Sequence, residues 1–172
     1  MGRKSVKENK NIYQTIRENQ DMSRQAASDA MEIVSTDRIE AIESEKSLAH
    51  PDEILAMAQA YGAPELCNYY CSHECPIGIE YTPSVEIKEF SQTILATLTS
   101  VNNIMKERDT LMSIGSDGKL DDFELEDFIR IQNELEKLSI TIESLQLWFE
   151  KHTLEKGYTK EFIQELKNKV SN

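Results

Sequence analysis

The stretch that decides the fold of the first part of the chain is Met22–Gly62, MSRQAASDAMEIVSTDRIEAIESEKSLAHPDEILAMAQAYG. Ser23 and Ser35 each stand before a short amphipathic segment, and serine is a preferred N-cap residue. Pro51 suits the first position of a further helix, and Gly62 suits the residue that ends it. The stretch therefore predicts two short helices separated by a brief turn, with a third helix after them.

The prediction extends in both directions along the chain. Asn11–Asn19 places Ile12 and Ile16 four residues apart, which predicts a short helix, and Pro64 opens another over Glu65–Tyr70. Residues 1–70 are thus predicted to form one helical domain of five helices.

The composition favours an all-α protein. The 172 residues allow one large domain or two small ones, 29% of them are charged, and there are only six Gly and four Pro. The apolar runs are too short to span a bilayer, and no apolar block follows the basic N-terminus. We therefore expect a cytoplasmic protein with no membrane partner.

The net charge of −12 restricts the class of partner, because a protein that binds duplex DNA needs Lys and Arg against phosphate. Residues 1–46 hold eight Lys/Arg and nine Asp/Glu, whereas residues 47–82 hold five acids and no Lys or Arg. The first part is therefore the least acidic, and its basic arm Arg3–Lys10 is the segment best suited to add contacts to phosphate.

From Asn11 to about Leu66 the chain resembles the Xre-type regulators of the lambda repressor/Cro superfamily. The residues that carry the resemblance occur in the family's order: Met22-Ser23-Arg24, Val34-Ser35, Arg38-Ile39, Ile42-Glu43 and Ala58-x-Ala60-Tyr61-Gly62. The resemblance implies a five-helix helix-turn-helix domain that places its third helix in the major groove of DNA and works as a dimer. The usual turn glycine is absent, since Met31-Glu32-Ile33 stands in its place.

The resemblance implies a DNA-binding transcriptional regulator. Arg24 and Gln25 would contact phosphate, and the side chains that would face base edges are Thr36, Asp37, Arg38 and Ala41. Asp37 and Glu40 are acids on this surface, which phosphates repel. The alternative is therefore a helical adaptor that uses the same domain to bind a protein instead of DNA.

A cluster of potential metal ligands follows the domain, at Cys67, Cys71, His73 and Cys75. Clustered Cys and His in a cytosolic protein indicate metal or redox chemistry more often than disulfides, so zinc and an iron–sulfur cluster are both candidate cofactors. The other interpretations are small side chains that pack the edge of the domain and a reversible disulfide. A metal- or redox-sensing switch is the third functional hypothesis, and no small-molecule effector can be named.

Residues 71–83 are predicted to be a linker, in which Ile77, Ile79 and Tyr81 could dock as a short extended segment. Residues 84–172 are predicted to form a helical hairpin. Its first arm is one long helix from Ser84 to about Met112, and Asp121 with Glu124 forms a capping box before the second.

The second arm carries apolar residues at alternating spacings of three and four: Phe128, Ile131, Leu135, Leu138, Ile142, Leu145 and Phe149. Such a seam is typical of a coiled coil, so it predicts either a homodimer or packing against the first arm of the same chain. Gly157 ends this helix, and Thr159 caps a last one. The chain shows no nucleophile–base pair and no phosphate-binding glycine loop, and we do not expect an enzyme.

Overall fold

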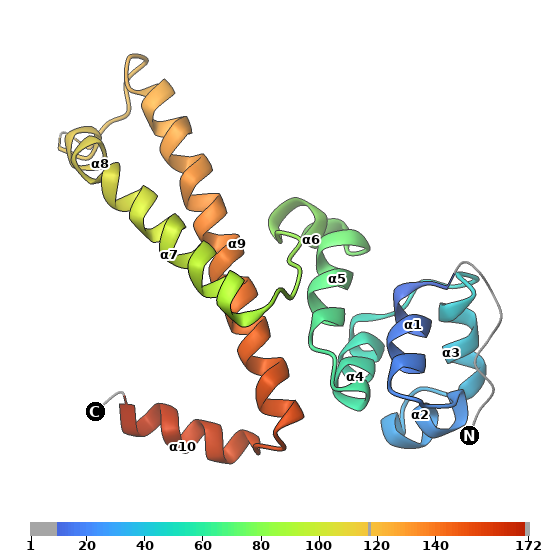
Figure 1. Ribbon diagram of the computed structural model, residues 1–172. Coiled ribbons are helices and arrows are strands. Elements are labelled where there is room, and N and C mark those ends of the chain that lie inside the picture. The colour runs from blue at the N-terminus through green and yellow to red at the C-terminus, as the bar shows by residue number, and fades with distance from the viewer. Residues whose placement is uncertain (1–9, 117, 171–172) are drawn as a thin grey trace. The chain divides into compact units, whose positions relative to one another are not determined.

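A computed structural model describes residues 10–116 and 118–170 (Figure 1). Over these residues the chain is all-α, with ten helices and no strand. It divides into two compact units, residues 1–84 with 150–172 and residues 85–149. We call residues 10–84 the head and residues 85–149 the hairpin, and each is described by itself.

The first four helices of the head begin where the sequence predicts, and the fourth ends at the predicted residue, Gly62. They are α1 (Ile12–Asn19), α2 (Arg24–Met31), α3 (Thr36–Glu43) and α4 (Pro51–Tyr61). The Oγ atoms of Ser23 and Ser35 accept hydrogen bonds from backbone N–H groups three residues later, which caps α2 and α3. Gly62 ends α4 in the left-handed conformation, with φ of 61°.

The core of the head is formed by side chains that lie between positions 13 and 66 of the chain. Its fully buried members are Val34, Ile39, Ile54, Met57 and Leu66, together with Ala27. Ala27 on α2 allows α3 to approach closely, since its side chain is small. The apolar spacing that predicted the helices thus also identifies most of the residues that hold them together.

The segment predicted as a linker is mostly helical, so that prediction is wrong. Helix α5 (Glu65–His73) is three residues longer than expected, and α6 (Pro76–Tyr81) follows it directly. Pro76 occupies the first turn of α6, where its missing N–H has no cost. Gly78 packs so tightly on α5 that an added Cβ would lie 2.0 Å from the carbonyl oxygen of Cys71.

The apolar side chains of this segment also differ from expectation. Ile77, Ile79 and Tyr81 lie on a helix rather than on an extended strand, and each is more than half exposed. Helix α6 therefore attaches to α5 through the small Gly78 and not through its large side chains.

The hairpin contains α7 (Phe90–Lys106), α8 (Arg108–Ile114) and most of α9 (Leu125–Glu155). The single helix predicted from Ser84 to Met112 is instead two helices. At Glu107 the backbone has φ of −86° and ψ of 1°, and its N–H bonds the carbonyl of Ile104 three residues back. No Pro or Gly marks this position, so residue propensities alone do not reveal the break.

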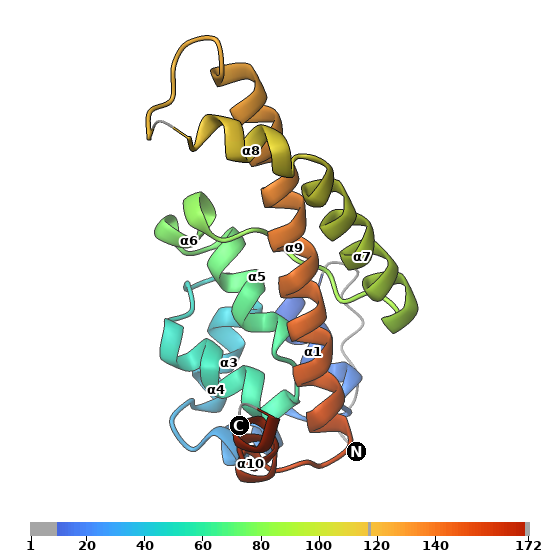
Figure 2. The same cartoon turned by 90° about the vertical axis from the view of Figure 1, so that its left-hand side faces the viewer.

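Helices α7 and α9 lie side by side and run antiparallel, as Figures 1 and 2 show. Along the contact, residue numbers rise on α7 while they fall on α9, as antiparallel helices require. The contacts are the stacked rings of Phe90 and Trp148, Thr97 Oγ1 to the Thr141 carbonyl, Asn103 to Glu134, and the ion pair of Glu107 with Arg130. Packing of the seam helix against the first arm of the same chain is thus present.

The two predicted caps in the C-terminal part are confirmed. Asp121 Oδ1 accepts the N–H groups of Phe123 and Glu124, and the Glu124 carboxylate accepts the N–H of Asp121. Thr159 Oγ1 accepts the N–H of Phe162 at the start of α10 (Lys160–Val170). Across the described residues, every helix is too short or too polar to cross a lipid bilayer.

Candidate nucleic-acid interface

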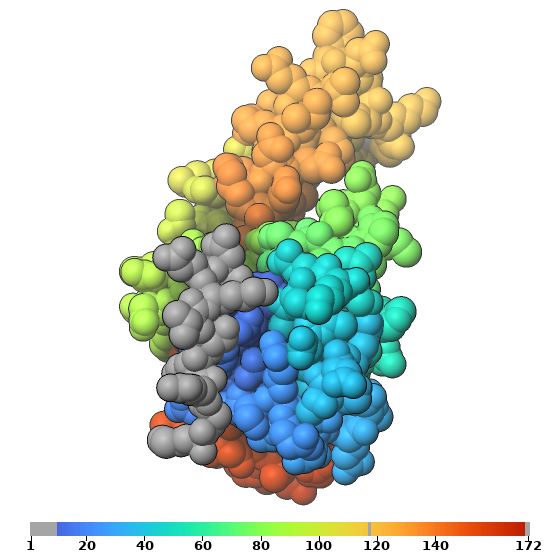
Figure 3. All heavy atoms as spheres, turned by 90° about the vertical axis from the view of Figure 1, so that its right-hand side faces the viewer, coloured from blue at the N-terminus to red at the C-terminus, as the bar shows by residue number. Residues whose placement is uncertain are grey.

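The surface that the sequence assigns to DNA is made by α2, the turn of residues 32–35, and the first part of α3. Figure 3 shows atoms of these segments, in blue to cyan, at the surface of the head. Asp37 and Glu40 are exposed, while Thr36 and Ala41 are partly exposed. Glu32 begins the turn with φ of 60°, a left-handed conformation that favours glycine.

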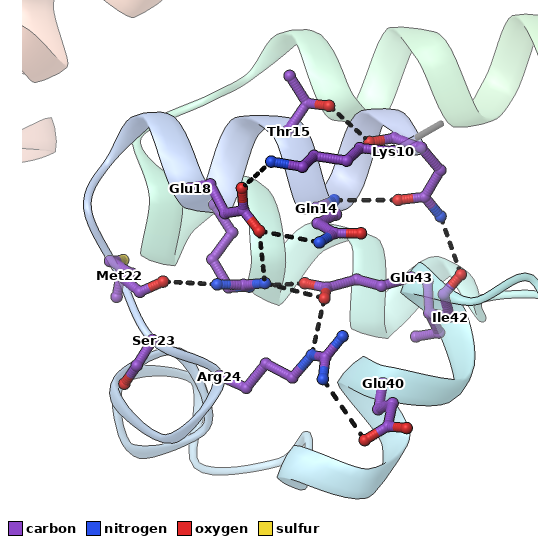
Figure 4. Close-up of polar contacts among 12 residues, drawn as sticks. Lys10, Gln14, Thr15, Glu18, Met22, Ser23, Arg24, Glu40, Ile42 and Glu43 are labelled. Atoms are coloured by element: carbon purple, nitrogen blue, oxygen red, sulfur yellow. Dashed lines mark hydrogen bonds and ion pairs between the residues drawn. The ribbon is translucent and has the colours of Figure 1, made fainter. Parts of the chain in front are cut away.

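Two arginines and one glutamate connect the helices behind this surface (Figure 4). The buried carboxylate of Glu43 accepts from Arg17 Nε at 2.6 Å and Nη2 at 2.9 Å, and from Arg24 Nε at 2.8 Å. Arg17 Nη1 also donates to the carbonyl of Met22 at 2.6 Å. Because these residues come from α1, α2 and α3, the network fixes the three helices relative to one another.

Electrostatics keep this network charged. Burial alone would lower the pKa of Arg17, but its hydrogen bond to Glu43 and the charge of that carboxylate raise it above the ordinary value. Tyr61 lies in the same region, and burial followed by the charge of Glu43 raises its pKa. Its buried hydroxyl has no hydrogen-bond partner among the described residues.

A second layer of polar contacts supports the network at α1. Glu18 accepts from Gln14 Nε2 at 2.8 Å and from Lys10 Nζ at 2.6 Å (Figure 4). Asn11 Nδ2 donates to the carbonyl of Ile42 at 2.9 Å, which ties the start of α1 to the end of α3.

The guanidinium of Arg38 is paired with other residues of the head. Its Nε and Nη2 atoms donate to the two carboxylate oxygens of Glu53 at 2.6 and 2.8 Å, and further donors reach Ser47 Oγ and the carbonyl of Leu48. The hydrogen bond from Arg38 is the first cause of a lowered pKa at Glu53, and the N–H of His50 adds to it. A base contact by Arg38 would therefore require breaking an existing ion pair.

The two residues assigned to phosphate, Arg24 and Gln25, also form contacts within the head. Arg24 divides its guanidinium between Glu43 and, at 3.4 Å, Glu40. Gln25 is exposed and donates to Asp29 at 2.8 Å. The basic arm Arg3–Lys10 lies outside the described residues except for Lys10.

The cysteine cluster lies along α5 and at the residue that precedes α6. Cys67 and Cys71 lie on α5, His73 ends α5, and Cys75 is the residue before α6. The three cysteines have free thiols. No group of three or more His, Cys, Asp or Glu side chains within the described residues is arranged to hold a metal ion.

The contacts of the cluster are those of packing. The His73 ring stacks on Tyr69 with centroids 4.5 Å apart, and its Nδ1 lies 2.8 Å from Ser72 Oγ. Burial is the main cause of a raised pKa at Cys67, so that thiol holds its proton more firmly than a free cysteine does. Zinc and iron–sulfur binding gain no support from this arrangement.

Comparison with protein-family models, with curated proteins and with solved structures finds no match to this chain. The likeness to Xre-type regulators therefore rests on the residues of the chain itself. Sequence reasoning missed Glu43 and Glu53 as the acids that bind Arg17, Arg24 and Arg38. A signal for Glu43 was available, because it lies four residues after the inward-facing Ile39 and therefore on the same side of α3.

Proposed function

We propose that the head is a helix-turn-helix domain that binds duplex DNA and acts in transcriptional regulation. The observation that carries the proposal is the pair α2 and α3, two eight-residue helices that are each capped by serine and joined by a four-residue turn. Their shared buried residues include Ala27, Val34 and Ile39. Together with the Xre-type resemblance, this pairing favours a domain that presents the start of α3 to a major groove.

The network around Glu43 has a role in this function that differs from direct contact. A recognition helix must be held at a fixed angle, because hydrogen bonds to base edges tolerate little displacement. The buried pair of Arg17 and Glu43 joins α3 to α1, and Arg24 joins it to α2. Thr36, Asp37 and Ala41 remain the candidates for contacts to bases.

Electrostatics predict that binding is weak and strongly dependent on salt. The head, residues 10–84, holds five Lys/Arg and thirteen Asp/Glu. Four of those five cations are paired with glutamates, and among the described residues Lys46 forms no ion pair. Charged contacts to phosphate must therefore come from Lys46, from the exposed part of Arg24, and from the basic arm.

The test is binding of the full chain to labelled, mixed genomic duplex at low and moderate salt, followed by selection of bound fragments. Gln25→Glu places a carboxylate where phosphate is expected and should weaken binding by about tenfold. Gln59→Glu on the exposed side of α4 is the matched control and should bind like the wild type. Absence of binding at the lowest salt would refute the proposal.

A protein-binding head is the second candidate, and the paired cations are the observation that favours it. Because the arginines are neutralised within the head, the exposed acids Glu32 and Asp37 dominate the charge of the surface made by α2, the turn and the start of α3. Such a surface suits a basic protein segment better than a polyanion.

One substitution separates the two functions by the sign of its effect. Asp37→Asn removes an exposed acid beside the start of α3. It should strengthen binding to DNA, since a repulsion is lost, and weaken binding to a Lys- and Arg-rich peptide, since an attraction is lost. Titration of both probes against the same protein shows which function the surface serves.

A further inference from the structure

Helix α7 is unusual for its lack of charge. From Phe90 to Met105 it contains no Asp, Glu, Lys or Arg, although 29% of the whole chain is charged. An ordinary surface helix carries charged residues on its solvent side. Depletion of charge together with exposed aliphatic residues is the composition of an interface core.

The side of α7 that meets α9 is not its apolar side. The buried residues of α7 are Thr93 and Ser100, and Thr97 reaches the Thr141 carbonyl of α9. The apolar stripe of α7 is left uncovered, since Leu98, Val101 and Met105 are 40–61% exposed.

On helix α9, too, the apolar stripe differs from the side that contacts α7. Its residues Phe128, Leu135, Ile142 and Phe149 recur every seven positions and are each 36–47% exposed. The contact with α7 instead lies along Glu134, Thr141 and Trp148. Of the seven seam residues, these four are thus exposed, whereas Ile131 is buried and Leu138 and Leu145 are partly buried.

The two uncovered stripes lie on one side of the hairpin. Thr97 and Thr141 mark the sides of α7 and α9 that face each other. At 3.6 residues per turn, the apolar stripe of α7 lies roughly 70° around the helix axis from Thr97, and that of α9 lies roughly 100° around its axis from Thr141. Both rotations have the same sense when each helix is viewed from its N-terminus. Because the helices run antiparallel, equal senses of rotation turn both stripes toward the same side. We call this surface the hairpin face: Leu98, Val101, Met105, Phe128, Leu135, Ile142 and Phe149.

We propose that the hairpin face binds the hairpin face of a second copy of this chain, so that two hairpins form a four-helix bundle. The inference does not depend on DNA binding by the head. The sequence pattern alone suggests a dimer in which two seam helices form a coiled coil. In the proposed bundle, α7 contributes to the dimer interface as much as α9 does.

The size of the face fits this occupant. At about 150–200 Å² for a large apolar side chain, the exposed fractions amount to roughly 500–650 Å². That is at the upper end of the largest apolar patch on a typical monomer. It also matches the apolar part of a standard interface, which buries about 800 Å² on each partner.

The charge around the face favours a second copy in particular. In a two-fold dimer the same residues meet themselves or close neighbours, so a charged border would repel its own copy. The neighbouring positions on α9 are Gln132, Ser139 and Gln146, which are exposed and uncharged. These uncharged positions reduce the repulsion between two copies of a chain of net charge −12.

The test is the molar mass of the full chain across a dilution series by analytical ultracentrifugation. Ile142→Glu places a carboxylate in the centre of the face and should weaken dimerisation by about 100-fold or more. Ile129→Glu is the matched control, because Ile129 is similarly exposed but lies on the opposite side of α9, and it should remain dimeric.

A second variant distinguishes the bundle from a coiled coil of seam helices alone. Leu98→Glu on α7 should dissociate the dimer like Ile142→Glu, with helix content by circular dichroism unchanged in both. A wild type that stays monomeric at high concentration overturns the proposal, and so does a dimer that survives either variant. Because the measurement contains no DNA, its failure is separate from failure of DNA binding.

Discussion

Arg38 and Glu53 form a two-bond ion pair that joins the first turn of α3 to the first turn of α4, with N–O distances of 2.6 and 2.8 Å. The same guanidinium holds the connecting loop through Ser47 and the carbonyl of Leu48. A residue that the sequence assigns to base contact is thus placed to stabilise the α3–α4 connection.

Replacement of Arg38 by Ala should lower the free energy of unfolding by about 2–3 kcal/mol, because several charge-assisted hydrogen bonds are lost together. Arg38→Lys retains the charge but not the two-bond geometry, so it should recover only part of the loss. Urea unfolding measures both variants. A stability equal to that of the wild type in Arg38→Ala would contradict this role.

The lowered pKa of Glu53 predicts a dependence of stability on pH. A depressed pKa in the folded state means that the ion pair stabilises the protein above the unfolded pKa of about 4.3. This contribution should disappear as the pH falls through the lower folded value. Thermal unfolding of wild type and Glu53→Gln should differ at neutral pH and converge as the pH falls below the lowered pKa of Glu53. A constant difference across the range would argue against the assignment.

Removal of Glu43 should destabilise the head more than any exposed substitution. Glu43→Ala leaves the buried Arg17 with only the longer contact to Glu18, at 3.9 Å, and loss of the close partner of a buried charge typically costs about 3–5 kcal/mol. Glu43→Gln keeps the shape but loses the charge and should fall between Ala and wild type. The control is Glu40→Ala, whose single contact with Arg24 is long and exposed. Equal losses in Glu43→Ala and Glu40→Ala would contradict the importance of the network.

Gly78→Ala should disrupt the attachment of α6 to α5, since the new Cβ would overlap the Cys71 carbonyl oxygen at 2.0 Å. We expect a loss of about 2 kcal/mol or more, with faster proteolysis after residue 75. Gly115→Ala is the matched control, because Gly115 has φ of −75° and its nearest outside atom would lie at 3.3 Å. Proteolysis at the same rate in both variants would exclude this packing.

Local signals predicted the parts of the fold that depend on local chemistry. Ser23, Ser35, Gly62 and Thr159 act at helix ends through hydrogen bonds or backbone conformations that their own residue types allow. The sequence does not predict helix α6, because Pro and Gly are common in loops, whereas here Pro76 starts the helix and Gly78 allows close packing.

The candidate site was less predictable for a physical reason. Sequence spacing indicates which side of a helix faces the core, but it does not indicate which carboxylate an arginine will meet in space. Arg17 and Glu43 are 26 residues apart, and Arg38 and Glu53 are 15 apart. Their pairing depends on the packing of whole helices, so the roles of Arg24 and Arg38 could be assigned only with the structure.

The core of the head has a consequence for synthesis of the protein. All of its buried apolar members lie between Tyr13 and Leu66, so the contacts that close it involve short separations along the chain. Domains rich in local contacts fold fast, and the N-terminal part of a chain leaves the ribosome first. The apolar core of the head can therefore form before α7 has left the ribosome. The uncharged helix then emerges when the core residues of the head are already buried, which limits wrong association with them.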